Sequence, residues 1–308
     1  MKLLFKKNQF LYLLMLSFVF ISTSAMVADQ ATGRQQSVIR KLPRSFVPIP
    51  LAKKSSSYPV LSANSVLAID MNTGVPLYEK NPDSQLFPAS TTKIVTALVA
   101  LDTYPLDSVI KVGKVNIVGQ KMGLTYGEEM RVEDLLYGLL VFSANDAAEV
   151  LADNYPDGRD SFINAMNDKA RMFSLDNTKF YNPSGIDGLG HVTTARDLIR
   201  VSTIAMKNPE FAKIVSTKEI IVKDISGKKV HKLANINELL GKVPGVLGVK
   251  TGWTESAREN LVTYLDRDNH KIMIAMLGSQ DRFGETEELI DWIFTSYEWQ
   301  EVKVAYSP

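Results

Sequence analysis

The stretch PASTTKIVTALVAL, residues 88–101, is a long apolar segment that opens with a proline and a serine. Its apolar residues recur at helical spacing, which predicts a helix from Ser90 to Leu101. The segment is apolar enough to be buried inside a folded domain. Two polar groups sit at its beginning, the Ser90 hydroxyl and the Lys93 amine, one helical turn apart.

Strand patterns lie on both sides of this helix in the sequence. Ser65 to Ile69 and Val75 to Tyr78 flank a turn at 71–74, and this arrangement predicts a hairpin. Helical patterns then follow at Val132 to Leu140, Asp146 to Asp153, Asp160 to Phe173, and Thr194 to Met206, where Thr194 and Asp197 are placed as a capping box. Strand patterns return at Glu219 to Lys223, Gly248 to Thr251, Leu261 to Leu265 and Lys271 to Leu277, before a closing helix from about Glu285 to Ser296.

Strands near both ends with helices between them indicate one sheet assembled from the two ends of the chain. A helical insertion would lie beside that sheet. We therefore expect a single discontinuous α/β domain rather than two domains in series.

The composition is that of an ordinary globular protein, with 45% hydrophobic and 22% charged residues. The chain has no cysteine, which excludes a disulfide framework, a thiol nucleophile and thiolate zinc sites. Its three histidines lack the spacing of a metal-binding helix, so we expect neither a metal nor another cofactor. A net charge of +1 argues against a nucleic-acid partner.

The first 28 residues have the order of an export signal. Three lysines precede the uncharged run Phe10 to Ile21, and small residues follow. The segment is either removed after export or retained as a signal anchor. The anchor is an alternative because the uncharged stretch Asn8 to Ala28 is about long enough to span a bilayer. We expect an exported protein, in the periplasm or on the outer face of the cytoplasmic membrane. Residues 29–58 are basic, contain three prolines and have no hydrophobic period, so we expect a linker.

Three short motifs carry the candidate chemistry: Ser90-Thr91-Thr92-Lys93, Ser143-Ala144-Asn145 and Lys250-Thr251-Gly252. Each is weak evidence alone, since residues 226–229 also fit S-x-x-K and residues 62–64 also fit S-x-N. The surroundings differ, because Ser226 lies in a polar turn whereas Ser90 opens an apolar helix.

Helix geometry makes Ser90 and Lys93 a candidate reactive pair. Residues three apart share a face, so the lysine amine can reach the serine hydroxyl. A serine is a poor nucleophile unless a base removes its proton, and lysine is a base only when burial or nearby positive charge lowers its pKa. The alternative is structural: Ser90 caps the helix and Lys93 is an exposed first-turn lysine.

The three motifs and their surroundings resemble the serine-type D-Ala-D-Ala carboxypeptidases, the low-molecular-weight penicillin-binding proteins, whose signature is S-x-x-K, S-x-N and K-T-G. The resemblance covers the chain from about Pro59 to its C-terminus, and the matching stretches are 88–93, 132–140, 143–148, 182–187, 194–198 and 248–252. It implies an α/β (α+β) fold of the β-lactamase/DD-peptidase type. In that fold an antiparallel sheet built from both chain ends has flanking helices and an all-helical subdomain.

The resemblance also implies roles for the first two motifs. Ser90 would attack the D-Ala-D-Ala carbonyl and Lys93 would take its proton. Ser143 would relay a proton toward the leaving amine. Asn145 would hold the substrate amide and the Lys93 amine.

The third motif would bind substrate. Lys250 would help keep Lys93 neutral and attract the terminal carboxylate, and Thr251 would hydrogen-bond that carboxylate. The backbone N–H groups of Ser90 and Trp253 would form the oxyanion hole. Gly252 is the last residue of the K-T-G triplet and directly precedes Trp253. The Trp253 ring would shape the pocket or stand at its rim.

Two neighbouring residues are less clear from the resemblance. Arg258 is a candidate carboxylate ligand, with a solvated salt bridge as the alternative. Ser184 stands where relatives often carry histidine, and we assign it no role.

The implied function is a DD-carboxypeptidase that removes the terminal D-Ala from peptidoglycan stem peptides ending in D-Ala-D-Ala and is acylated by β-lactams. A DD-endopeptidase is the alternative, followed by a β-lactamase or a non-catalytic penicillin-sensing domain. No glutamate occurs between Glu149 and Glu210, where a deacylating glutamate would be expected, so rapid penicillin hydrolysis is disfavoured. A Ser-His-Asp hydrolase is disfavoured by the absence of G-x-S-x-G. We expect residues 59–308 to form the catalytic domain, without the C-terminal β-domain of many relatives.

Overall fold

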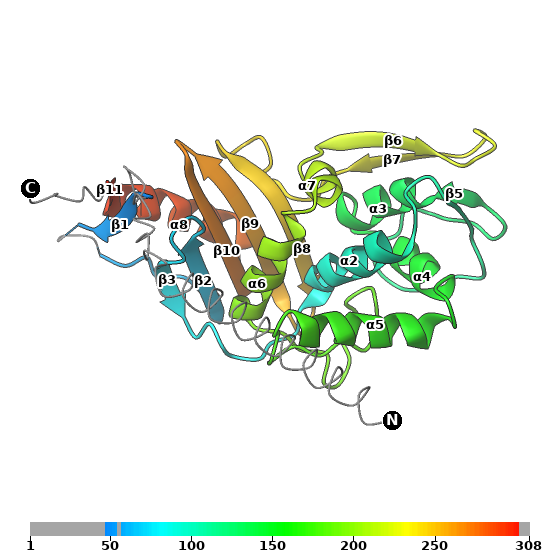
Figure 1. Ribbon diagram of the computed structural model, residues 1–308, viewed down its shortest axis with the longest axis horizontal. Coiled ribbons are helices and arrows are strands. Elements are labelled where there is room, and N and C mark those ends of the chain that lie inside the picture. The colour runs from blue at the N-terminus through cyan, green and yellow to red at the C-terminus, as the bar shows by residue number, and fades with distance from the viewer. Residues whose placement is uncertain (1–46, 54–56, 302–308) are drawn as a thin grey trace, which may run out of the picture. The chain divides into compact units, whose positions relative to one another are not determined.

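A five-stranded antiparallel sheet, in the order β3-β2-β10-β9-β8, is the centre of the fold (Figure 1). The computed structural model describes residues 47–53 and 57–301. Two strands come from the N-terminal part of the described chain and three from its C-terminal part: β2 (Ser65–Asp70), β3 (Pro76–Lys80), β8 (Val246–Thr254), β9 (Arg258–Arg267) and β10 (His270–Ser279). The predicted assembly of one sheet from both ends is therefore confirmed.

The central strand β10 pairs with β2 on one side and β9 on the other, so that Ile274 lies opposite Ala68 and Thr263. The turn between β9 and β10 consists of Asp268 and Asn269, whose φ values are +54° and +64°. Positive φ at both positions is the requirement of the two-residue turn that matches the twist of a hairpin. The predicted hairpin over 261–277 is thus present and extends further at both ends.

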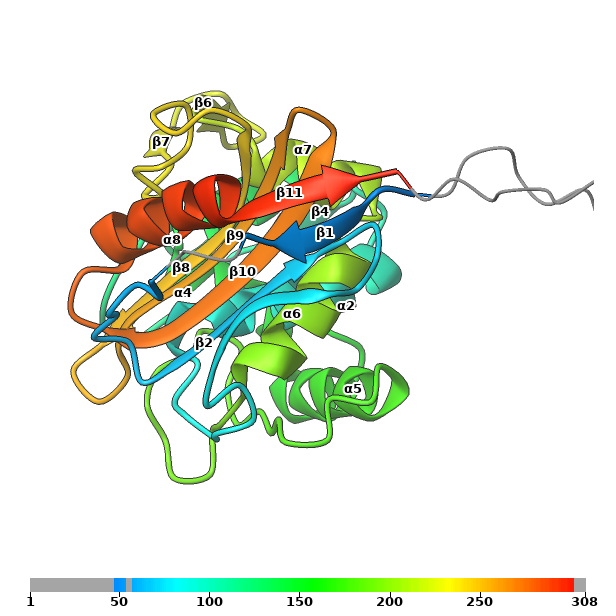
Figure 2. The same cartoon turned by 90° about the vertical axis from the view of Figure 1, so that its left-hand side faces the viewer.

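Both faces of the sheet are buried, which explains why its strands are apolar at nearly every position. Side chains of β10 alternate between the faces. On one face they pack against α8 (Arg282–Ser296), as Figure 2 shows, and on the other they face α6 (Ala195–Ala205). The residues that meet α8 include Ile272, Ile274 and Met276, whereas those in the helical core include Met273, Ala275 and Leu277.

The apolar helix predicted from Ser90 is the centre of the helical part. It begins as a 3-10 turn, η1 (Ala89–Thr92), and continues as α2 (Lys93–Thr103). Every residue from 93 to 100 is buried, because α2 contacts four other helices. These are α3 (Val132–Leu140), α4 (Asn145–Asp153), α5 (Arg159–Met172) and α6. No side-chain capping bond forms at Ser90, and Lys93 is fully buried, so the structural alternative for this pair is wrong.

The insertion is not entirely helical. It also carries two antiparallel strand pairs, β4 (Val109–Lys111) with β5 (Glu129–Arg131) and β6 (Glu219–Lys223) with β7 (Val230–Ala234). The short helix α7 (Pro209–Val215) precedes β6, and Pro209 at its first position suits a helix start. Figure 1 shows the β6–β7 hairpin extending from the sheet region over α3.

Only one of the two hydrogen bonds of the capping box predicted at α6 forms. Thr194 Oγ1 accepts a hydrogen bond from the backbone N–H of Asp197, at 3.0 Å. The Asp197 carboxylate instead accepts from the Asn177 N–H and the Thr178 hydroxyl, at 3.0 and 2.7 Å. The carboxylate therefore fixes the preceding loop rather than the N-terminus of the helix.

Part of the expected linker is a strand. β1 (Ile49–Ala52) pairs antiparallel with β11 (Tyr297–Gln300), which follows α8. The predicted export signal, residues 1–28, lies outside the described residues. Within the described ranges, no helix is both long and apolar enough to cross a membrane.

Candidate active site

A cleft of about 710 Å³ lies where η1, the loop before α4 and strand β8 meet. Five residues of the three sequence motifs line it, Ser90, Ser143, Asn145, Thr251 and Gly252, together with Trp253, which follows the third motif. The cleft therefore brings together stretches that are far apart in the sequence. The two lysines of the motifs, Lys93 and Lys250, are fully buried.

The Lys93 amine is held by three oxygen atoms. Its Nζ donates to Ser90 Oγ at 2.9 Å, to Asn145 Oδ1 at 2.7 Å and to the Ser184 carbonyl oxygen at 2.5 Å. The first bond spans the junction between η1 and α2, which places the lysine one turn beyond the serine. This is the contact that a base needs with the hydroxyl it deprotonates.

Burial lowers the pKa of Lys93 to about 7, although the Glu149 and Asp146 carboxylates act in the opposite direction. A substantial fraction of this amine is therefore neutral near pH 7, as proton abstraction requires. Of the two causes considered from the sequence, burial and nearby positive charge, burial is the main one.

The loop conformations before α4 fix the second motif. Ser143 has φ +60° and is buried, and Asn145 begins α4 with its backbone N–H donating to the Gln120 carbonyl at 2.7 Å. The Asn145 Nδ2 donates to the Val118 carbonyl at 2.7 Å, so its Oδ1 faces Lys93. One hydrogen of Nδ2 remains for a ligand in the cleft.

The third motif lies on β8, the edge strand nearest η1. Lys250 Nζ donates to the Thr251 carbonyl oxygen at 3.1 Å. Burial, together with the charges of Lys93 and Arg282, lowers the pKa of Lys250 well below its usual value. The buried Thr251 Oγ1 has no hydrogen-bond partner within the part of the chain that the structure describes. Trp253 is 63% exposed at the rim of the cleft.

Arg282, the first residue of α8, also lines the cleft, and the motifs do not reveal it. Its Nη1 donates to the Gly252 carbonyl at 3.0 Å, whereas its buried Nε has no partner among the described residues. Burial lowers the pKa of Arg282 from its ordinary value. The candidate named from the sequence, Arg258, is instead an exposed residue at the β8–β9 turn and does not line the cleft.

Close backbone packing holds η1 in place. A Cβ at Gly252 would come 3.1 Å from the Ser90 nitrogen, and a Cβ at Gly185, whose φ is +86°, would come 1.9 Å from the Ala89 carbonyl oxygen. Glycine is therefore required at 185, and the backbone leaves little room for a side chain at 252. The buried Asn260 of β9 donates to the carbonyls of Phe87 and Pro88, at 2.9 and 3.0 Å.

Ser184, to which the sequence assigned no role, contacts the lysine through its backbone. Its carbonyl accepts from Lys93, and its hydroxyl donates to Glu149 Oε1 at 3.2 Å. Arg159 pairs with the other oxygen of Glu149 at 2.7 Å. His191 supports η1 by a 2.9 Å contact with Thr92 Oγ1, and burial lowers the pKa of His191 to about 4.

The competing sequence motifs lie elsewhere. Ser226 is exposed at the tip of the β6–β7 hairpin and donates to Asp224, and Ser62 accepts from the Gln280 N–H. Neither lines the cleft. Among residues 47–53 and 57–301, no group of three or more histidine, aspartate or glutamate side chains could hold a metal ion.

Known proteins are similar to this chain in both sequence and fold. A sequence profile of the D-alanyl-D-alanine carboxypeptidase family matches residues 52–281. The chain is 32% identical over 267 residues to the D-alanyl-D-alanine carboxypeptidase DacF of Bacillus subtilis, covering 82% of this chain and 68% of that protein. It is 30% identical over 262 residues to the D-alanyl-D-alanine endopeptidase of Escherichia coli, covering 81% and 84% respectively.

The fold is similar to the crystal structure of the Streptomyces K15 DD-transpeptidase. The TM-score is 0.73 at 31% identity, and the superposition covers 78% of this chain and 99% of that one. The match therefore includes nearly the whole of that structure.

Proposed function

The chain belongs to the D-alanyl-D-alanine carboxypeptidase family and is a serine DD-peptidase, and from this premise we propose how its cleft performs the reaction. Family members act on peptidoglycan peptides ending in D-Ala-D-Ala and bind β-lactams. The observation that carries the proposal is the amine of Lys93, which contacts both the Ser90 hydroxyl and the Asn145 amide oxygen.

In the acylation step, Ser90 Oγ forms a bond to the carbonyl carbon between the two D-Ala residues. Neutral Lys93 takes the hydroxyl proton, and the backbone N–H groups of Ser90 and Trp253 stabilise the oxyanion. The carbon–nitrogen bond then breaks, and the proton reaches the departing amine through Ser143. The products are free D-Ala and an ester on Ser90.

In the deacylation step, a water molecule replaces the amine. Its oxygen bonds to the ester carbon, the bond to Ser90 Oγ breaks, and one proton returns to that oxygen. Lys93 accepts the proton from water and passes it on, which requires the same neutral amine as acylation.

We assign the terminal carboxylate of the substrate to Thr251 and Arg282. The Thr251 hydroxyl lacks a partner, and the Arg282 guanidinium has an unpaired buried nitrogen beside the same cleft. Buried groups of this kind cost free energy until a ligand satisfies them. An arriving carboxylate would also raise the pKa of Lys250 and so favour its positively charged form.

Penicillin would acylate Ser90 and remain attached. Its ring-opened ester keeps the leaving nitrogen tethered, so deacylation depends on a well-placed water. Class A β-lactamases use a glutamate for this purpose, and the sequence between Glu149 and Glu210 supplies none.

Endopeptidase activity on crosslinked peptides is the second candidate, because the chain is also similar to proteins named D-alanyl-D-alanine endopeptidase. The same bond chemistry serves both reactions, and the leaving amine decides between them. A carboxypeptidase releases D-Ala, whereas an endopeptidase releases a second peptide.

The substrate places the protein in the cell envelope. We propose that residues 1–28 direct export and that this segment is either cleaved or kept as a membrane anchor. The segment has the charge and hydropathy order of an export signal. Reading the N-terminal sequence of the exported protein distinguishes cleavage from retention.

The proposed function is tested by incubating the purified protein with two substrates, a pentapeptide stem ending in D-Ala-D-Ala and a crosslinked stem dimer. Release of D-Ala from the pentapeptide supports the carboxypeptidase. Cleavage of the dimer alone supports the endopeptidase. Labelling by a fluorescent penicillin without either reaction supports a sensor and contradicts the proposal.

A further inference from the structure

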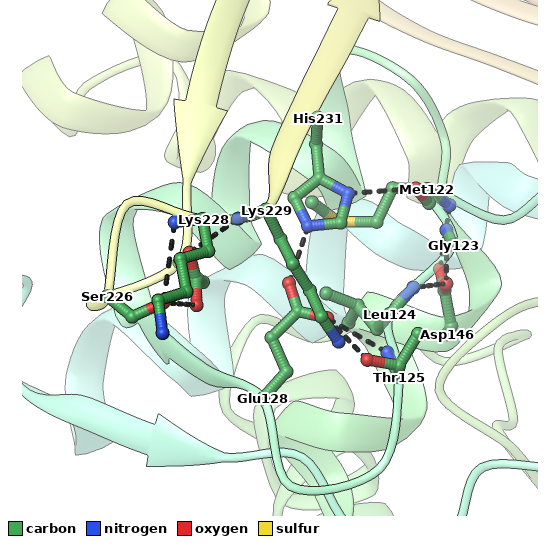
Figure 3. A network of polar contacts seen from close by, with 11 residues as sticks. Met122, Gly123, Leu124, Thr125, Glu128, Asp146, Ser226, Lys228, Lys229 and His231 are labelled. Atoms are coloured by element: carbon green, nitrogen blue, oxygen red, sulfur yellow. Dashed lines mark hydrogen bonds and ion pairs between the residues drawn. The ribbon is translucent and has the colours of Figure 1, made fainter.

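A second cluster of buried charged groups joins the β6–β7 hairpin to the loop before β5 (Figure 3). His231 on β7 is buried, and the side chain of Glu128 is fully buried. The His231 Nε2 lies 2.6 Å from Glu128 Oε1, and its Nδ1 lies 3.0 Å from the Met122 carbonyl oxygen. Both ring nitrogens therefore face oxygen atoms.

This geometry specifies the protonation state of the ring. A carbonyl oxygen can only accept, and an ionised carboxylate can only accept. A neutral imidazole has one donor and one acceptor nitrogen, so one of the two contacts would bring two acceptors together. The imidazolium form has donors at both nitrogens and satisfies both contacts.

The pKa of Glu128 agrees with its place as an acceptor in this cluster. Although burial alone would raise it, hydrogen bonds from His231 and Thr125 hold the pKa of Glu128 below its usual value, so the carboxylate is ionised. The other charged groups facing the ring are Lys229 on the same hairpin, 3.5 Å from Glu128 Oε2, and Asp134 on α3. Glu128 and Asp134 offset the two positive charges.

The loop fixed by His231 is the loop that holds the active-site amide. The N–H groups of Met122, Gly123 and Leu124 donate to the Asp146 carboxylate at 2.9 to 3.0 Å. The carbonyls of Val118 and Gln120 accept from Asn145, as described above. Segment 118–128 is thus bonded to His231 through Met122 and Glu128. The same segment is bonded to Asn145 and Asp146 through residues 118–124.

We propose that His231 is a positioning residue for acylation, whose ring, held between Glu128 and the Met122 carbonyl, keeps segment 118–128 against Asn145. This inference rests on the roles proposed for Asn145 and Lys93. Loss of the two ring contacts loosens the segment, and acylation by penicillin then becomes slower.

The state of the ring can be read directly. The chain has three histidines, so ¹⁵N labelling gives three sets of ring signals, which the variants His191→Gln and His270→Gln assign. We expect both nitrogens of His231 to carry hydrogen-bonded N–H groups in the folded protein, as the two ring contacts require. A ring without a hydrogen-bonded N–H at one of the two nitrogens would overturn the inference, whatever the activity of the protein.

The consequence for catalysis is measured as the second-order rate of acylation by a fluorescent penicillin between pH 5 and 10. We expect His231→Ala to be about tenfold slower, the loss that follows from removing one buried hydrogen bond. His270→Ala is the matched control, because His270 stacks on Trp299 with ring centroids 4.0 Å apart and does not line the cleft. Equal rates for His231→Ala and the wild type would overturn the inference.

Glu128→Gln keeps the test decisive if His231→Ala does not fold. The glutamine amide can donate to the ring Nε2 while its oxygen still accepts from Thr125, so a neutral ring satisfies both of its contacts. We expect this variant to be acylated at close to the wild-type rate, whereas Glu128→Ala, which removes the contact with the ring, should be about tenfold slower. Equal rates for Glu128→Ala and the wild type would contradict the inference. A wild-type protein that is not labelled at all contradicts the proposed function instead.

Discussion

The Nζ of Lys93 lies 2.9 Å from the Oγ of Ser90, and the lysine side chain is fully buried. A buried lysine is costly as a cation, and burial lowers its pKa to about 7. The same burial that disfavours the charged form therefore supplies the neutral amine that the proposed base requires. The fold achieves this by surrounding α2 with four helices, while Ser90 in the preceding turn lines the cleft.

Replacing Ser90 by alanine removes the proposed nucleophile. We expect Ser90→Ala to abolish both penicillin labelling and D-Ala release, without loss of the folded structure. Ser226→Ala is the matched control, since Ser226 belongs to the other S-x-x-K sequence but lies exposed at the hairpin tip. D-Ala release by Ser90→Ala at the wild-type rate would refute the assignment of the nucleophile.

Replacing Lys93 removes the proposed base. We expect Lys93→Ala to slow acylation by about a thousandfold or more, the scale seen when one member of a catalytic unit is lost. Lys93→Arg should not restore the rate, because a guanidinium stays protonated. Stopped-flow acylation measures both. Recovery of activity by arginine would mean that the residue acts through its charge.

The pKa of Lys93 sets the acid side of the pH profile. Below about pH 7 the amine is protonated, so acylation by penicillin should fall about tenfold per pH unit as the pH decreases. Above that value the rate should reach a plateau before any alkaline decline. A rate independent of pH between 5 and 7 would show that Lys93 is not the base.

Thr251→Val and Arg282→Leu test the carboxylate site. Each removes a hydrogen bond to a charged group, worth about 1.5 to 3 kcal/mol, so kcat/KM for D-Ala release should fall roughly ten- to a hundredfold. The control is a substrate whose C-terminal carboxylate is amidated. The wild type and both variants should cleave that peptide at similar rates, and an equal loss on both substrates would argue for a structural effect.

Gly185→Ala tests the packing behind the nucleophile. The added Cβ would overlap the Ala89 carbonyl oxygen, and the backbone has φ +86°, so we expect a destabilisation of at least about 1 to 3 kcal/mol. Gly188→Ala is the control, because a Cβ there meets no atom within 4 Å. Chemical denaturation of the two variants gives the comparison. Equal stability would show that η1 can shift without cost.

Local patterns predicted the elements whose formation depends on neighbours in the sequence. The helix over 132–140 and the strand over 219–223 appear at the predicted residues, because amphipathic and alternating periods span each of them. β1 and β4 were not predicted. They are three or four residues long, and β1 pairs with β11, nearly 250 residues away.

The same distinction applies to the cleft. The residues of the three motifs were predicted from the resemblance to known enzymes. This was possible because each motif is a short continuous stretch of sequence. Arg282, Asn260 and the pair of Glu128 and His231 could not be found this way. Each acts through a contact between distant segments, and each looks like an ordinary polar residue in its own stretch. The one signal in the sequence is the position of Asn260 directly before the apolar run 261–265.

The central claim is that Ser90 forms the covalent intermediate. Intact-mass spectrometry after incubation with benzylpenicillin, followed by peptide mapping of the adduct, tests it most directly. The account predicts one penicillin per chain, attached to Ser90 and still present after the excess drug is removed. No adduct, or an adduct on Ser143 or another residue, would contradict it.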